Sequence, residues 1–275
     1  MGNIWEITRQ TVREAFARKI FIMFASISTL ILLLFIVAFI SVGAENFGGS
    51  IHFESRGMNG TSMVDGIVDG LKIFIVAPLF GLGLFLSIFS VSSFIPAMLE
   101  KGNIDVLLSK PIARYQIIFG KFFGGTAVVF VNILYLIGGI WLLLGIKFDV
   151  WDPSFLLSTL TITFAFAVLY ALIILVGILS QSSILAMMLS YIIFIVLSPI
   201  LNARDKIMML SDSKILENIL DALYYIIPKT SELGSMTTDI AVGGHIYDYQ
   251  PIFTSAIFLI LSLALSIIIF SKKDY

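Results

Sequence analysis

The chain has 275 residues, of which 59% are hydrophobic and only 13% are charged. A soluble domain is typically about 25% charged, so this chain lacks the polar surface that a water-soluble globule needs. Its net charge of −1 indicates no nucleic-acid partner, and the absence of cysteine excludes disulfides and thiolate metal sites. The composition therefore predicts a membrane protein.

The first predicted element is an amphipathic helix over residues 3–19. Its apolar stripe consists of Ile4, Trp5, Thr8, Val12, Ala15 and Phe16. Such a helix lies in the membrane interface, where Trp5 and the arginines anchor it. Two roles stay open: a plain anchor for the following span, or a lateral elbow that also contacts a cytoplasmic partner. The residues assigned to the elbow role are Trp5, Arg9, Arg13 and Arg18.

Six apolar stretches are each long enough for a helix that crosses a hydrocarbon core about 30 Å thick. We expect helices because a spanning segment must satisfy its own backbone hydrogen bonds, and the alternation of a barrel strand is absent. The whole chain, 1–275, forms one transmembrane domain, and a polar cluster at 180–183 separates the fourth span from the fifth. The predicted spans are about 20–43, 73–95, 122–145, 156–179, 184–202 and 251–271.

Six spans place both termini on the same side of the membrane. The termini and the loop after the second span carry more basic than acidic residues, whereas the other loops carry more acidic ones. Positive charge favours the cytoplasmic side, so we predict a multi-pass protein of the cell (inner) membrane with both termini in the cytoplasm. The basic residues on that side are Arg9, Arg13, Arg18, Lys19, Lys101, Lys110, Arg114, Lys121, Lys272 and Lys273.

The loop between the second and third spans, 96–119, contains a short predicted helix that ends at Pro111. Ile104, Leu107 and Leu108 share one face of this helix. An apolar face on a membrane loop needs a cover, so it packs either on the ends of neighbouring helices or on a docked partner. The residues predicted to contact such a partner are Glu100, Lys101, Gly102, Ile104, Leu107, Leu108, Pro111 and Arg114.

The outer loops suggest interfacial structure rather than chemistry. The first, 45–71, contains His52, Met58 and Met63, whose irregular spacing argues against a copper site. The second, 202–250, contains a helix that begins near the good N-cap residues at 211–213 and ends at Pro228. We expect this helix to lie on, or dip into, the outer leaflet, either as plain interfacial structure or as a gate. Its apolar stripe consists of Ile215, Leu216, Ile219, Leu220, Leu223 and Ile227.

The sequence carries no motif of an enzyme, so we predict no catalytic, cofactor-binding or metal-binding residue. Gly120-Lys121-Phe122 lacks the upstream glycine and the following Ser or Thr of a phosphate-binding loop. The apolar spans hold no ionisable side chain, which argues against an ion-coupled transporter. Asn132 is predicted to make a helix–helix hydrogen bond. The predicted close-packing positions, for a neighbouring helix or a dimer seam, are Gly81, Gly83, Ser87 and Ser90.

Two motifs can be compared with known families. The loop motif reads Glu100-x-Gly102, then Leu107-Leu108-Ser109-Lys110-Pro111-Ile112-x-Arg114, then Gly120-Lys121. The N-terminal motif reads Ile4-Trp5-x-Ile7-x-Arg9-x-Thr11-x-Arg13-Glu14-Ala15, followed by Arg18-Lys19. Both motifs, with six spans and a basic tail, resemble the ABC-2 type transporter permeases, and the resemblance covers nearly the whole chain.

The resemblance implies a permease that forms a translocation path as a homodimer or related heterodimer. Separate cytoplasmic ABC ATPase subunits would bind ATP and magnesium, and this chain would hold no cofactor and catalyse no reaction. The segment 97–114 would be the coupling helix, with the elbow beside it and membrane lipids around the spans. Two other hypotheses stay open: a non-transporting membrane scaffold that anchors an envelope or cytoplasmic complex, and a stand-alone transporter or channel.

Overall fold

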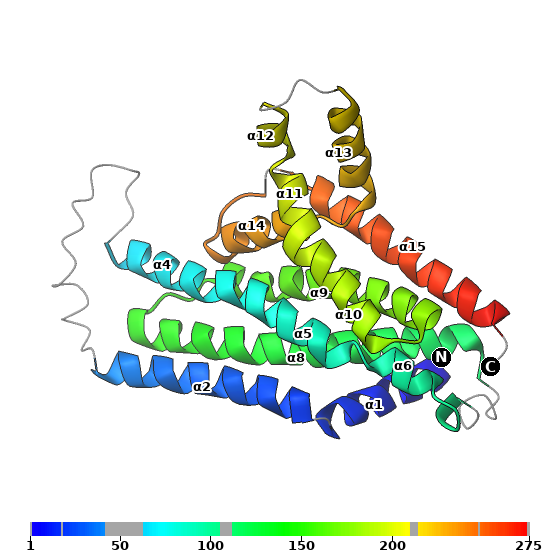
Figure 1. The fold of residues 1–275 in the computed structure, drawn as a ribbon. Coiled ribbons are helices and arrows are strands. Elements are labelled where there is room, and N and C mark those ends of the chain that lie inside the picture. The colour runs from blue at the N-terminus through cyan, green and yellow to red at the C-terminus, as the bar shows by residue number, and fades with distance from the viewer. Residues whose placement is uncertain are drawn as a thin grey trace.

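The computed structural model describes residues 2–17, 19–41, 63–104, 112–209, 214–246 and 248–273. All regular secondary structure among these residues is helical (Figure 1), which confirms the predicted all-α class for this part of the chain. Helices suit so apolar a chain because each one satisfies its backbone hydrogen bonds internally, without water.

Five helical runs within the described ranges are long and apolar enough to cross a membrane. They are Gly66–Leu99, Arg114–Phe148, Pro153–Ser180, Ser183–Asn202 and Gln250–Lys272. A further apolar helix, Phe24–Val37, is shorter and belongs to the 23-residue helix α2 (Lys19–Ser41). The coarse expectation of a polytopic helical fold is therefore confirmed, and the count of six spans stays a prediction.

The elements in the first half of the chain form three long rods and an N-terminal helix. They are α1 (Gly2–Ala17), α2, α4 (Met63–Pro78), η1 (Leu79–Gly83), α5 (Leu84–Val91), α6 (Phe94–Leu99) and α8 (Arg114–Phe148). The segments from α4 to α6 make one bent rod, in which η1 is a short π-helix. The bend follows from Pro78, which lacks an amide hydrogen, and from the π-helix itself.

The second half begins with the central helix and ends with a long C-terminal helix. Its elements are α9 (Pro153–Ser180), α10 (Ser183–Tyr191), the π-helix η2 (Ile192–Leu197), α11 (Ser198–Asn202), α12 (Arg204–Met208), α13 (Lys214–Ile226), α14 (Thr230–Ala241) and α15 (Gln250–Lys272). α9 ends and α10 begins within the polar cluster at 180–183. Two side chains cap helix starts. Asp152 accepts from the Ser154 amide at the start of α9, and Ser182 accepts from the Leu185 amide at the start of α10.

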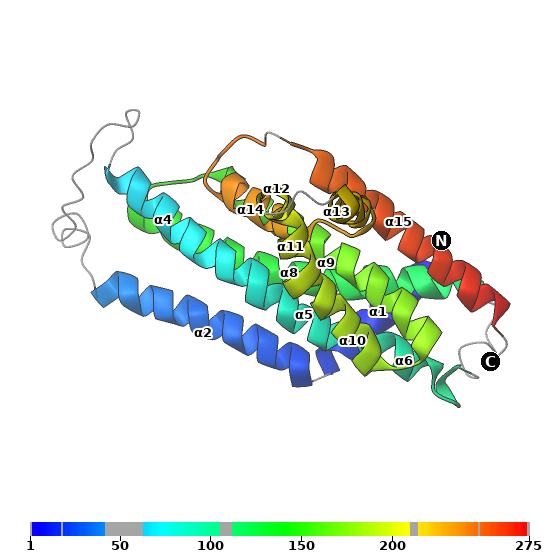
Figure 2. The ribbon, with the colours of Figure 1, turned by 45° about the horizontal axis from the view of Figure 1, so that its top comes forward.

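Helix α9 is the core of the bundle. Most of its length is buried, from Phe155 to Ile178, because α8, α10, α14 and α15 all pack against it. α1 and α2 pack on α8 instead, so α2 lies at an edge of the bundle (Figure 2). The main apolar cluster extends over nearly all the helices, and a second, small one joins Leu201 of α11 to Leu220 and Tyr224 of α13.

The segment between the last two spans differs in part from expectation. The predicted interfacial helix is α13, which projects with α12 from the side of the bundle (Figure 1). α14 was not predicted, because its sequence, TSELGSMTTDIA, is too polar to stand out as a buried helix. It nevertheless packs on α9 and α4, where Leu233 and Thr237 are fully buried.

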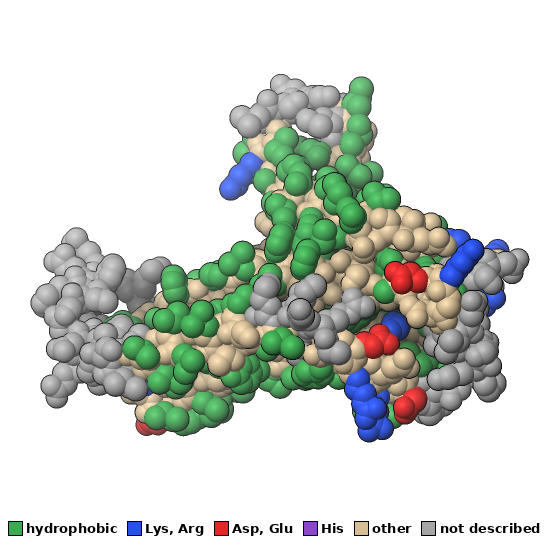
Figure 3. Space-filling model, turned by 60° about the horizontal axis from the view of Figure 1, so that its bottom comes forward, with side chains coloured by type: hydrophobic (Ala, Val, Ile, Leu, Met, Phe, Trp, Pro, Cys, Tyr) green, Lys and Arg blue, Asp and Glu red, His purple; other side chains and the backbone are tan. Residues whose placement is uncertain are grey.

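Charged side chains are distributed unevenly over the surface. On the face shown in Figure 3 they gather at the end of the bundle that holds α1, while apolar side chains cover its length. Both termini lie at that same end (Figure 1). Exposed apolar side chains such as Phe74, Ile146 and Phe253 lie along the helices, as a surface that faces lipid requires.

Candidate functional site

The end of the bundle that carries the termini, here called the inner end, contains a tight turn after α6. The Glu100 carbonyl accepts hydrogen bonds from the amides of Asn103 and Ile104, at 3.1 and 3.2 Å. Gly102 has φ +91°, a value that favours glycine over any residue with a β-carbon. The side-chain amide nitrogen of Asn103 donates to the Ala97 carbonyl at 2.9 Å, and this bond closes the turn. The Glu100 and Lys101 side chains are left exposed.

The rest of the predicted coupling helix is described only in part. Ile104 is 3% exposed and belongs to the bundle core. Its side chain therefore packs on neighbouring helices, which was the alternative to contact with a docked partner. Leu107, Leu108 and Pro111 lie outside the described residues, as do Arg18 of the elbow, the loop with His52 and the N-cap candidates at 211–213. The partner-facing role of the loop stays a prediction.

Arg114, at the first turn of α8, binds the end of the last helix. Its Nη1 donates to the carbonyls of Phe270, Ser271 and Lys273, at 2.8, 3.2 and 2.7 Å. These carbonyls end α15 and have no partner within their own helix, so a guanidinium is a fitting cap. The Lys273 amine in turn donates to the Ile178 carbonyl near the end of α9 at 3.0 Å. Arg114 thus joins the start of α8 to the C-terminus.

The N-terminal helix α1 packs closely on α8 through two glycines spaced four residues apart. A β-carbon on Gly120 would lie 2.5 Å from Ile7 Cγ2, and one on Gly124 would lie 2.6 Å from Thr11 Cβ. Only glycine permits this approach, which also brings the Thr8 hydroxyl to 3.3 Å from the Gly120 carbonyl. The sequence contains the glycine pair as a Gly-x-x-x-Gly spacing, of which only the first glycine, Gly120, belongs to the motif compared with known families.

An ion pair holds the same contact. Lys121 is 6% exposed, and its amine lies 2.6 Å from Glu14 Oε2. The Tyr170 hydroxyl of α9 donates to the Lys121 carbonyl at 3.1 Å, and a β-carbon on the adjacent Gly125 would lie only 2.5 Å from that tyrosine ring. A buried ammonium is tolerated because its charge is paired. α1, α8 and α9 are therefore one packed unit at the inner end.

The buried stripe of α1 shares only Ala15 with the predicted one. Ile7, Thr11 and Ala15 are buried, at 5%, 0% and 2% exposure, whereas Trp5 and Phe16 are 71% and 51% exposed. The helix is rotated relative to the expectation because the glycine pair on α8 leaves room for the side chains of Ile7 and Thr11. Trp5, Arg9 and Arg13, which were assigned to the elbow role, are all exposed.

In the middle of the bundle, the two π-helices lie in the second and fifth predicted spans and their neighbouring aromatic rings meet. Phe85 stacks on Tyr191 with ring centroids 4.4 Å apart, and the Tyr191 hydroxyl donates to the Phe85 carbonyl at 2.9 Å. Phe80 of η1 and Phe194 of η2 lie 6.3 Å apart. A cleft of about 460 Å³ opens beside them; its lining includes Leu82, Ile195, Pro199 and Gly234.

π-helices are rare in proteins, but those that occur are often found at functional sites. The two neighbouring π-helices therefore make this cleft a candidate functional site. The sequence analysis missed it. The available signals were Pro78, directly before η1, and Pro199, two residues after the end of η2, each inside an apolar run. Nearby, Ser87 and Ser90 are 0% and 7% exposed, so these positions pack within the chain.

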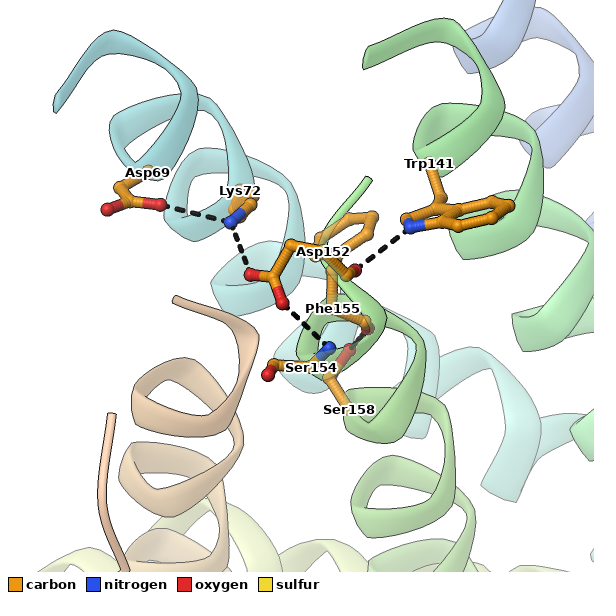
Figure 4. A network of polar contacts seen from close by, with 7 residues as sticks. All are labelled: Asp69, Lys72, Trp141, Asp152, Ser154, Phe155 and Ser158. Atoms are coloured by element: carbon orange, nitrogen blue, oxygen red, sulfur yellow. Dashed lines mark hydrogen bonds and ion pairs between the residues drawn. The ribbon is translucent and has the colours of Figure 1, made fainter. Parts of the chain in front are cut away.

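At the opposite, outer end, a network of polar groups joins α4 to the start of α9 (Figure 4). The Lys72 amine lies 3.0 Å from Asp69 Oδ1 and 2.7 Å from Asp152 Oδ2. Asp152 Oδ1 accepts from the Ser154 amide, and its carbonyl accepts from Trp141 Nε1, both at 2.9 Å. Burial alone would raise the pKa of the Asp152 carboxyl, but the bonds from Lys72 and Ser154 hold it below its usual value.

A second outer cluster ties the projecting α12 and α13 to α14. The ring of Tyr224 lies between two cations, with Arg204 Cζ 3.3 Å and Lys229 Nζ 3.6 Å from its centroid. The Lys229 residue is 3% exposed. Burial lowers the pKa of its amine, although the Glu232 carboxylate opposes that shift. These cation–π contacts hold α12, α13 and the start of α14 together.

The described residues offer little that could hold a ligand by charge. Within them, no group of three or more His, Asp or Glu side chains could bind a metal ion. Asn132 is 3% exposed, and its side-chain nitrogen makes no hydrogen bond within the described part of the chain, so the expected helix–helix bond from that atom is not found there. The arrangement instead joins helices to one another at both ends of the bundle, with apolar side chains between the two ends.

Comparison with known families decides what kind of membrane protein this is. A family model described as "ABC-2 family transporter protein" matches residues 7–275, which is almost the whole chain. The chain belongs to the ABC-2 transporter family. No curated protein matches the sequence at a significant level. In this ABC-2 permease the matched region includes α1 from Ile7 onward, the Glu100 turn, Arg114 and both π-helices.

Proposed function

We propose that this ABC-2 permease is the membrane subunit of an ATP-binding cassette transporter, in which two copies form the translocation path. ATP would be bound and hydrolysed on separate cytoplasmic subunits, because the sequence has no phosphate-binding loop. The proposed setting is the inner membrane, with six spans and both termini in the cytoplasm. The termini at one end of the bundle in Figure 1 support an even number of crossings.

The observation that carries this proposal is the inner end, where an exposed, charged surface is joined to the ends of the spans. Glu100 and Lys101 point out from a turn that Gly102 and Asn103 fix in shape. Exposed charges at the rim of an interface steer and orient a partner. A folded turn that presents two opposite charges supports the docking of an ATPase subunit.

The contacts around that surface would pass its movement to the spans. α1 is fixed to α8 by the glycine pair and by the bond between Glu14 and Lys121. Arg114 fixes the start of α8 to the end of α15. A partner that displaces the elbow and the turn would therefore move α8 and α15 together, since packed helices respond as units rather than by continuous deformation.

The cleft beside the π-helices is the candidate lining of the path. Its walls come from the second and fifth predicted spans and from α14. Directly beside the two π-helices, the Tyr191 hydroxyl at the end of α10 donates to the Phe85 carbonyl at the start of α5 and joins the two walls. π-helical segments bend more readily than a regular helix, which supports a moving wall there.

The test is co-purification with the ABC ATPase encoded beside this chain. A Lys101→Glu, Arg9→Glu double variant should weaken the complex by about tenfold, the effect of losing roughly 1.4 kcal/mol of interface energy. The matched control is Lys206→Glu, an equally exposed lysine on α12 at the other side of the molecule. A Leu107→Asp, Leu108→Asp double variant should abolish the complex.

An unaltered complex in both double variants would contradict the assigned docking surface. A complex that forms, but in which ATP changes no distance between α4 and α10, would instead favour the membrane scaffold. That distance can be followed by pairs of introduced cysteines, because the chain has no cysteine of its own.

A further inference from the structure

A second apolar cavity, which shares only Leu82 and Phe85 with the lining of the π-helix cleft, lies between α2 and the bent rod formed by α4, η1 and α5. Its volume is about 600 Å³, and Leu136 of α8 also contributes to its lining. Among the described residues, the lining carries no ionisable side chain, and its one polar side chain is Ser28. Its walls include Ile27, Ile31, Leu34, Ile75, Leu79 and Leu82.

The cavity exists because α2 packs mainly on α8 and makes few contacts with α5 of the bent rod. A β-carbon on Gly139 of α8 would lie 2.7 Å from Leu32 Cδ2, so these two helices approach closely. The Thr29 and Tyr135 hydroxyls, 3.3 Å apart, add a polar contact on the same side. α4 and η1 meanwhile bend at Pro78, and Pro78, Leu79 and Gly83 all line the cavity. A straight, regular second span would close on α2.

Water is a poor occupant of this volume. It would need about 20 molecules to fill it, at roughly 30 Å³ each, and each water needs two to four polar partners. One serine hydroxyl cannot supply them. Apolar cavities of only about 150 Å³ stay dry and accept apolar ligands, so a cavity four times larger calls for a hydrocarbon occupant.

The dimensions also favour a narrow occupant over a helix from a second copy. Phe24 and Phe35 both line the cavity and lie eleven residues apart on α2, which is about 16 Å along the helix axis. The volume spread over that length gives a mean cross-section of about 37 Å², whereas a helix about 10 Å across needs roughly 79 Å². The occupant is therefore narrow. Its length is about half of a 30 Å hydrocarbon core, which is the depth of one leaflet.

We propose that this cavity binds a single acyl chain of a membrane phospholipid. The chain lies between α2 and the bent rod, along the stretch of α2 from Phe24 to Phe35. It fills the space that α2 leaves against α4, η1 and α5, and it holds α2 apart from them. This site does not depend on transport, and it lies on the α2 side of the bent rod, whereas the cleft proposed as the path lies on the side of η2 and α14.

The test is photolabelling of the full chain in vesicles of phosphatidylethanolamine and phosphatidylglycerol that contain a phosphatidylcholine with a diazirine in its acyl chain. Leu34→Trp should fill the cavity, and Leu33→Trp is the matched control. The two leucines are neighbours with 60% and 53% exposure, but Leu33 lines a different groove on the far side of α2.

We expect adducts on Ile31 and Leu79 that fall about tenfold in Leu34→Trp, the effect of displacing roughly two buried methylenes, and stay unchanged in the control. Equal labelling in both variants, or adducts spread evenly around α2, would mean ordinary surrounding lipid and would overturn the proposal. So would disulfide-linked dimers of an Ile31→Cys variant, because they would place a second copy there.

A measurement on the unaltered chain covers the case in which Leu34→Trp fails to fold. Native mass spectrometry after mild delipidation should find one phospholipid retained per chain, and a chain that retains none would refute the site. Function of the transporter enters neither experiment, so failure here leaves the proposed function intact.

Discussion

The two ends of the bundle use buried lysines in different ways. At the inner end, Lys121 pairs with Glu14 of α1, and α1 keeps Trp5, Arg9 and Arg13 exposed on its other side. At the outer end, Lys72 turns inward to both Asp69 and Asp152. The inner network joins helices and also presents a charged surface, whereas the outer network only joins helices.

This difference teaches where a partner can act on the molecule. A partner at the inner end can contact α1 or the Glu100 turn without breaking the pair that holds α1 to α8. At the outer end, any group that drew Lys72 away would leave two carboxylates without their cation, which is costly for groups only partly in water. The inner end thus leaves charged side chains exposed, whereas the outer network turns Lys72 inward to its two carboxylates.

The largest expected effect breaks the inner packing. Gly120→Leu should lower stability by about 1–3 kcal/mol, or displace α1 altogether, because its side chain would collide with Ile7. The measurement is the midpoint of thermal unfolding in detergent. Gly138→Leu is the matched control, since Gly138 lies on the same helix with no neighbour within 4 Å. Equal shifts in the two variants would contradict the close approach of α1.

The next effect breaks the outer network. Lys72→Met should cost about 1–2 kcal/mol, less than a fully buried pair, because Asp69 and Asp152 are partly exposed at 41% and 24%. Adding Asp152→Asn should restore part of the loss, since it removes the unpaired carboxylate. Lys206→Met on α12 serves as the exposed control. A double variant less stable than Lys72→Met would argue against the pairing.

A smaller effect separates joining from presenting at the inner end. Arg114→Gln should cost about 1 kcal/mol through lost bonds to the carbonyls that end α15, and should speed removal of the C-terminal residues by carboxypeptidase. Lys101→Gln, on the exposed turn, should leave both properties unchanged and weaken only partner binding. If Lys101→Gln also frees the C-terminus, the two roles are not separate.

The smallest effect is the pH dependence of the outer network. The folded pKa of Asp152 lies below its usual value, so its contribution to stability is complete above about pH 4 and is lost as pH falls through the folded value. The loss should be about 1 kcal/mol or less for a carboxylate that is partly exposed. Unfolding midpoints of the natural chain and Asp152→Asn should converge at low pH. Parallel curves would show that Asp152 does not titrate there.

Much of the coarse architecture could be predicted from the sequence, because hydropathy depends on composition along the chain. The break between the fourth and fifth spans and the helix that ends before Pro228 are also local, since a polar cluster and a proline act on their own neighbours. The motifs around Glu100 and Arg114 indicated the family for a similar reason, as they are short and contiguous.

The contacts between distant segments could not be predicted in the same way. Arg114 was assigned to a partner, yet it caps α15, more than 150 residues away in the sequence. α14 is polar by composition and buried by packing. The π-helices arise where two bent spans meet, and one sequence gives no measure of which spans those are.

The sequence by itself determined that the chain is an apolar bundle of helices, that its charges gather at the segments between them, and that it resembles one transporter family. Those properties follow from residue types and their spacing along one chain. Only the tertiary structure decided which face of α1 is buried, what Arg114, Lys72 and Lys121 bind, and where α2 leaves a cavity. Each of these depends on how two segments approach in space. A glycine or a proline on one helix shapes such a contact only together with the helix that packs against it, and the sequence does not say which helix that is.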